Sequence, residues 1–95
     1  MRNYKTKNLL GNNKISLLVQ RGYRFDGFIN GFVSYPINSY RVVLVKMPSG
    51  IYELNFMLLN GMLFRPTDIE VYTDKNGKET LEAEVKWLRD NNIFK

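Results

Sequence analysis

The chain contains neither cysteine nor histidine. The lack of cysteine excludes disulfides, thiolate nucleophiles and zinc–thiolate sites, and it is typical of a reducing compartment. The lack of histidine removes the side chain that most often acts as a general base or a metal ligand. The phosphate-binding loops and nucleophile motifs of common enzyme classes are also missing. We therefore expect a protein that is not an enzyme and that uses no metal and no cofactor.

Long hydrophobic runs are absent as well. The longest apolar runs, 42–45 and 56–59, are far too short to span a bilayer, and we expect no signal peptide and no membrane partner. We therefore expect a cytoplasmic protein. A chain of 95 residues with 44% apolar residues is sufficient for one domain covering 1–95. The single alanine and the frequent Asn, Lys, Ile, Tyr and Phe are typical of a low-GC bacterium or its phages.

Positive and negative charges are distributed unevenly along the chain. Residues 1–66 carry nine Lys/Arg and two acids, a net charge of +7, whereas residues 67–95 carry five Lys/Arg and seven acids, a net charge of −2. Together they give the overall net charge of +5. A basic segment rich in aromatic residues indicates a surface that contacts an anionic partner, with nucleic acid or a nucleoprotein as the leading candidate.

The first half of the chain predicts an arm, a strand and a hairpin region. Residues 1–13 are polar and basic without periodicity, which predicts a flexible arm. Residues 14–21 (KISLLVQR) predict a strand, with a short helix ending at Gly22 as the alternative. Asp26-Gly27 and Asn30-Gly31 are competing hairpin-turn signals, of which only one can be a tight turn. The other glycine would then permit a bulge or a close backbone approach.

The clearest element is a hairpin of residues 40–47 and 51–58 around Pro48-Ser49-Gly50. Placing Met47 opposite Ile51 aligns Leu44 with Leu54 and Val42 with Phe56 on one apolar face, which we expect to form the core. The opposite face is too apolar to be fully hydrated. It therefore requires a cover, either the C-terminal helix or a partner, and a second copy of the chain would serve.

The last third predicts a strand at 68–73, a turn at 74–77 and a helix at 79–91. A hairpin closing on Asn76-Gly77 is the alternative for this region. Taken together, the patterns predict an α+β, mainly β fold. It consists of a β-rich core at 14–73 arranged as a small antiparallel, barrel-like sheet, with one C-terminal helix.

The region from Gly27 to Tyr72 resembles small five-stranded barrels of the Tudor/KOW type. The matching pieces are Gly31-Phe32-Val33, Tyr40–Val45, Gly50–Leu54 and Leu63-Phe64-Arg65-Pro66. The resemblance covers about half of the chain. It implies a fold that binds nucleic acid or a protein tail and rarely performs catalysis.

The residues from 21 to 46 alternate cations with flat rings, the combination that single-stranded nucleic acid requires. Cations neutralise phosphates, and rings stack on bases. The candidate interface consists of Arg21, Tyr23, Arg24, Phe28, Tyr35, Tyr40, Arg41 and Lys46. For the phenylalanines Phe25, Phe28 and Phe32 we favour burial in the core, and for the Tyr–Arg pairs both binding and burial remain open.

A second class of function fits the same observations. Small size, low-GC composition and a partly apolar sheet face are typical of phage or mobile-element proteins that bind and inhibit a host protein, such as a defence nuclease, in the manner of anti-CRISPR proteins. The two hypotheses differ in whether nucleic acid or a protein occupies the surface.

Overall fold

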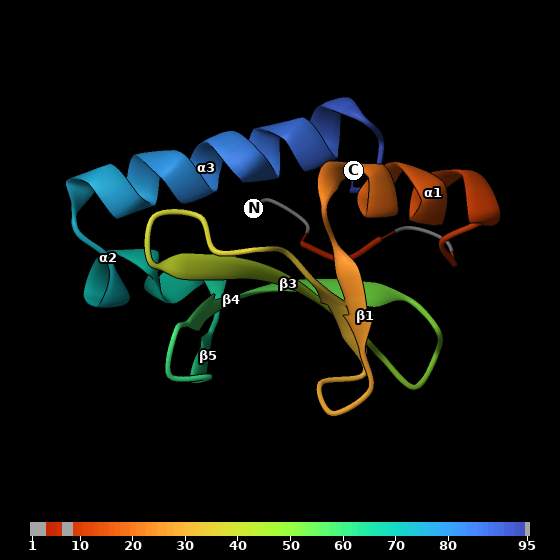
Figure 1. Cartoon of the computed structure of the whole chain (residues 1–95), viewed down its shortest axis with the longest axis horizontal. Coiled ribbons are helices and arrows are strands. Elements are labelled where there is room, and N and C mark those ends of the chain that lie inside the picture. Colours follow the sequence, from red (N-terminus) through yellow and green to blue (C-terminus); the bar gives the residue numbers. More distant parts are fainter. Residues whose placement is uncertain (1–3, 7–8, 95) are drawn as a thin grey trace.

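The computed structural model describes residues 4–6 and 9–94, and in these ranges a five-stranded antiparallel sheet packs against helices (Figure 1). The elements, in chain order, are α1 (Asn12–Arg21), β1 (Arg24–Asp26), β2 (Gly31–Val33), β3 (Tyr40–Lys46), β4 (Tyr52–Leu58), β5 (Leu63–Phe64), the 3₁₀ turn η1 (Pro66–Asp68), α2 (Ile69–Tyr72) and α3 (Lys75–Asp90).

The sheet is an open meander with the strand order β1-β2-β3-β4-β5. The α+β class is confirmed, but the barrel-like closure is wrong. Closure requires the first strand to pair with the last, whereas β1 and β5 lie at opposite edges. Both edge strands are also short, with three and two residues, so they offer little backbone for a closing ladder.

The predicted β3–β4 hairpin is confirmed in its register. Val42 pairs with Phe56 and Leu44 pairs with Leu54, and all four side chains are buried. Their face of the sheet, the inner face, packs against Leu18 of α1 and against three residues of α3, which are Leu81, Val85 and Leu88. Alternation along the strands therefore separates the core from the opposite face, as the hydrophobic pattern predicts.

Residues 14–21, predicted as a strand, belong to α1, so that prediction is wrong. Gly22 caps the helix with φ at 107°, and its N–H donates to the carbonyls of Leu18 and Val19. Only glycine adopts this conformation readily, so Gly22 ends the helix rather than preventing it. Buried Leu18 and half-buried Ile15 provide the apolar contact that stabilises this short helix against the core.

The predictions for residues 68–77 are also wrong. Residues 66–72 form η1 and α2 instead of a strand, with Pro66 in the first turn, where its missing N–H leaves no bond unmade. Helix α3 begins at Lys75, four residues before the predicted start. The Asp74 carboxylate caps it by accepting the Gly77 N–H at 2.7 Å. The alternative hairpin over Asn76-Gly77 is therefore wrong too.

The predicted flexible arm is ordered where it is described. The Thr6 N–H donates to the Tyr52 carbonyl at 2.9 Å, and the Leu54 N–H donates to the Tyr4 carbonyl at 2.8 Å. Residues 4–6 thus pair with β4, so the prediction of flexibility is wrong for this part of 1–13. Residues 1–3 and 7–8 of the arm lie outside the described residues.

The two turn signals of the first hairpin are combined in one loop. Asp26 pairs with Gly31, so the residues between them form a four-residue loop and neither signal marks a two-residue turn. Gly31 provides the expected close approach, because a Cβ at this position would lie 2.1 Å from the Leu44 carbonyl oxygen. Strands β2 and β3 can adopt this register only with glycine there.

Helices α1 and α3 lie on the same side of the sheet, and none of the described helices lies on the opposite side (Figure 1). The second face of the sheet is called here the open face. Among the described residues, no helix has the length and apolar character needed to cross a membrane.

Candidate nucleic-acid interface

The open face has an apolar strip at its centre, in which Val43 and Met57 are buried, and charged residues lie around it. Arg24 of β1 pairs with Val33 of β2, which pairs with Val43 of β3. Arg41 of β3 pairs with Met57 of β4. Because neighbouring strands place paired residues on the same side, these five side chains share the open face.

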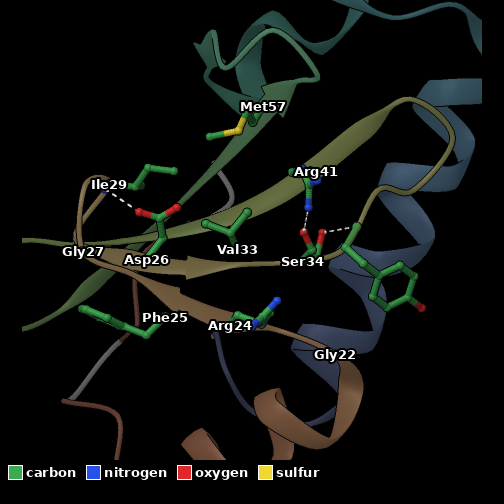
Figure 2. Close-up of a pocket in the computed structure, with 11 residues that line it drawn as sticks. Gly22, Arg24, Phe25, Asp26, Gly27, Ile29, Val33, Ser34, Arg41 and Met57 are labelled. Atoms are coloured by element: carbon green, nitrogen blue, oxygen red, sulfur yellow. Dashed lines mark hydrogen bonds between the residues drawn. The ribbon is translucent and has the colours of Figure 1, made fainter.

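A hollow of about 630 Å³ lies at the β1–β2 side of this face (Figure 2). Its charged lining consists of Arg24, Asp26 and Arg41, and Tyr35 contributes a ring. Its apolar lining is formed by Ile29, Val33 and Met57. Two arginines against one carboxylate give the lining a net charge of +1.

Arg41 is held in place by the backbone after β2. Its Nη1 donates to the Ser34 carbonyl at 2.8 Å, the bond drawn in Figure 2. Ser34 is buried, and its hydroxyl accepts the Val42 N–H at 2.9 Å and donates to the Tyr35 carbonyl at 2.9 Å. A guanidinium has five N–H donors, so Arg41 keeps donors for an anion while one of them fixes its direction.

Arg24 and Asp26 lie two residues apart on β1 and have different surroundings. Arg24 is exposed and forms no ion pair within the described part of the chain. The Asp26 carboxylate accepts the N–H of Phe28 at 2.8 Å and that of Ile29 at 3.4 Å. Asp26 is therefore used to shape the loop, whereas Arg24 remains available for a ligand anion.

Tyr35 stands beside the hollow with 56% of its surface exposed. Its ring lies against the backbone of Gly22, where an added Cβ would come within 2.7 Å of Cδ1 and Cε1. A glycine cap on α1 therefore also makes room for the ring. A supported ring that remains half exposed can stack on a flat ligand.

Two residues of the predicted interface, Arg21 and Tyr23, are engaged inside the molecule. Both contact Glu84, a buried carboxylate of α3: Arg21 Nη2 donates to Oε1 at 2.8 Å, and the Tyr23 hydroxyl donates to Oε2 at 2.8 Å. Arg21 also stacks over Trp87, with its guanidinium carbon 4.7 Å from the ring centroid. Tyr23 is 2% exposed and cannot touch a partner, so its place in the interface is a misassignment.

Burial is the main cause that raises the pKa of Tyr23 well above its ordinary value, and the charge of Glu84 adds to it. The same carboxylate, through its hydrogen bond, raises the pKa of Arg21. Burial also raises the pKa of Tyr52. Tyr23 therefore stays protonated in the folded protein at alkaline pH, whereas in the unfolded chain it ionises near its ordinary pKa of about 10.

Tyr23→Phe is expected to make the protein less sensitive to alkali. The folded-state pKa of Tyr23 lies above the unfolded value, so its contribution is complete below pH ~10 and is lost as the pH rises, by about 1.4 kcal/mol per unit. Urea unfolding at pH 9 and pH 11 measures this loss. Between the two pH values, the free energy of unfolding should fall by ~1 kcal/mol less in the variant than in the parent chain. Tyr52 is present in both proteins, so its ionisation lowers the two values equally. Identical losses would contradict this assignment.

The other predicted residues lie apart from the hollow. Tyr40 is half buried, and its hydroxyl donates to the Tyr72 carbonyl at 3.2 Å. Lys46 is exposed at the end of β3. Phe28 lies in the β1–β2 loop and is fully exposed. The structure thus brings together Arg24, Tyr35 and Arg41 from the predicted set.

Three residues that shape the site do not stand out in the sequence. Ser34 and Asp26 act through hydrogen bonds to nearby residues of the sheet and its loop, and Glu84 is one of four acids on α3. The burial of Glu84 could have been inferred from its position on the apolar side of the helix, because it precedes Val85 and follows Leu81 by three residues.

Within residues 4–6 and 9–94, no group of three or more carboxylates is placed to hold a metal ion.

Comparisons of the chain with protein-family models, with curated proteins and with solved structures found no match. The resemblance to Tudor/KOW barrels therefore stays a prediction.

Proposed function

We propose that this protein is a non-enzymatic module of the cytoplasm that binds single-stranded nucleic acid on the open face, with the hollow of Arg24, Tyr35 and Arg41 as the centre of the site. The observation that carries the proposal is that two guanidinium groups without a carboxylate partner in the described chain and one exposed ring line the same hollow as apolar residues. Each component matches one part of a nucleotide.

The arginines suit the phosphates. Arg24 has no carboxylate partner in the described chain, and Arg41 is bound only to a neutral carbonyl. A guanidinium that is not neutralised by an acid can form charge-assisted bonds to phosphate oxygens. By contrast, Arg21 and Lys5 face Glu84 and Glu53, and they contribute less to an external anion.

The ring and the floor suit the base. Tyr35 offers a face for stacking, and Val33 and Met57 offer an apolar surface beneath. The hollow of about 630 Å³ falls in the range of small-molecule pockets, which fits one or two nucleotides rather than a folded partner domain. In a duplex the bases are stacked on each other, so this arrangement favours a single strand.

The test is a fluorescence anisotropy titration of a labelled single-stranded oligonucleotide with matched charge variants. Arg24→Gln with Arg41→Gln removes two positive charges from the hollow. Lys75→Gln with Lys86→Gln removes two from α3, which covers the other face of the sheet. We expect the hollow variant to bind at least about tenfold more weakly and the helix variant to stay within about threefold of the parent chain.

Equal losses in both variants would mean that the attraction comes from net charge alone and would overturn the assignment of the site. Circular dichroism should show both variants folded, because the four altered side chains are exposed or partly exposed and none belongs to the core.

A second candidate, the inhibition of a host protein such as a defence nuclease, is favoured by a different observation. Leu59, Met62 and Leu63 around the β4–β5 turn are exposed. Apolar side chains gathered in this way are typical of protein contacts. A complex with a purified nuclease that survives removal of nucleic acid and is lost in Leu59→Lys with Leu63→Lys would favour this function over the first.

A further inference from the structure

The most exposed aromatic side chain of the described residues is Phe28, whose exposure of 104% means that nothing in the fold covers its ring. Its neighbour Ile29 is half buried and lines the hollow, as does Gly27 on the other side. The loop therefore turns one apolar residue towards the site and presents the other to solvent. An aromatic ring left fully in water has an unfavourable hydration free energy that a partner would relieve.

The loop that carries Phe28 is fastened at both ends. At its start, the Asp26 carboxylate accepts the Phe28 N–H at 2.8 Å. At its end, the Asn30 carbonyl accepts the N–H of Lys46 at 2.8 Å, and Asn30 adopts a φ of 57°. The ring is thus presented by a constrained turn rather than by a loose segment, which lowers the entropic cost of using it in binding.

Basic residues lie next to the loop that carries this ring. Lys46, bonded through its backbone to the end of the loop, is exposed and has no ion pair among the described residues. The carboxylate of the loop, Asp26, is occupied by two backbone N–H groups. Arg24 and Arg41 line the hollow together with Asp26, and Figure 2 shows Arg24 on β1 and Arg41 on β3.

From this arrangement we propose that Phe28 stacks on an unpaired base next to the nucleotide held in the hollow, while Lys46 contacts the phosphate beyond it. The proposal rests on the proposed function and extends the site from one hollow to a track over β1, the loop and the end of β3. It also makes Phe28 the residue that selects single strands, because a base must be unpaired to expose its face to the ring.

The experiment compares Phe28→Ala, Phe28→Leu and Phe28→Trp with the parent chain, using labelled single-stranded and hairpin-duplex DNA of the same composition. Loss of one stacked base is expected to weaken single-strand binding by roughly 5- to 100-fold in the Ala variant. The Trp variant should bind as well as the parent or better, and the Leu variant should resemble Ala, because leucine keeps apolar area but has no flat face. The free energy of unfolding in urea should be unchanged in all three variants, because no described residue covers the ring.

The outcomes separate this proposal from the one on which it rests. If Phe28→Ala binds like the parent while Arg24→Gln with Arg41→Gln binds weakly, the stacking role is wrong and the hollow keeps its function. If Leu restores binding as well as Trp, the ring makes a general apolar contact and the stacking proposal is overturned. Equal binding of duplex and single strand, or no binding of either by the parent chain, overturns it as well.

Discussion

Glu84→Ala is expected to lower the free energy of unfolding by about 3 kcal/mol. The substitution leaves the buried Tyr23 hydroxyl without its acceptor and removes the anion that faces Arg21. A hydrogen bond to a charged group contributes about 1.5–3 kcal/mol. The ion pair adds less than ~1 kcal/mol, because the Arg21 side chain is 40% exposed. Urea unfolding followed by circular dichroism measures the change.

Two controls distinguish the hydrogen bond from the charge at this position. Glu84→Gln keeps an oxygen that accepts the Tyr23 hydroxyl, so it should lose only ~1 kcal/mol. Glu82→Ala changes an exposed acid on the same helix and should leave stability within about 0.5 kcal/mol. If Glu84→Ala were as mild as Glu82→Ala, the Arg21–Tyr23–Glu84 cluster would not connect α1 and α3 as described.

Reversal of both charges in the hollow, Arg24→Glu with Arg41→Glu, is expected to reduce affinity for a single strand by at least ~100-fold at low salt. Each lost phosphate contact also removes about 0.7 from the slope of log K against log salt for a single strand. Two contacts therefore predict a slope that is smaller in magnitude by about 1.4. Anisotropy titrations at several salt concentrations measure the affinity and the slope together.

The matched control is Lys75→Glu with Lys86→Glu, which changes the net charge by the same amount on α3. Non-specific attraction predicts equal effects, whereas a site in the hollow predicts a much smaller loss for the helix variant. The helix variant breaks one exposed pair, Lys86 with Asp90, which contributes only a few tenths of a kcal/mol. An unchanged slope in the hollow variant would show that Arg24 and Arg41 do not touch phosphate.

The central hairpin could be predicted from the sequence because its signals agree. The turn residues Pro48-Ser49-Gly50 and the alternation of both strands indicate the same register, which the pairing of Val42 with Phe56 confirms. Helix α1 could not be predicted in the same way. Its ten residues include the β-branched Ile15 and Val19, and its stability depends on packing of Leu18 into the core, a contact that no local pattern reveals.

The candidate site was predicted in part. Interleaved cations and rings pointed to a segment that contains Arg24, Tyr35 and Arg41, which the structure places around one hollow. The pattern could not separate them from Arg21 and Tyr23, because that distinction depends on Glu84, which is 61 residues away from Tyr23 in the sequence. The sequence alone does not show whether a charged or aromatic residue contacts a ligand or a distant carboxylate of the same chain.

The most direct test of the central claim is an NMR titration of the ¹⁵N-labelled protein with a short single-stranded oligonucleotide. We expect the amide shifts of Arg24, Phe28, Val33, Ser34 and Arg41, on the open face and its loop, to change. The amide shifts of residues on the exposed side of α3, such as Glu82 and Lys86, should not change. Changes confined to α3, or small changes spread evenly over all basic residues, would contradict a nucleic-acid site on the open face.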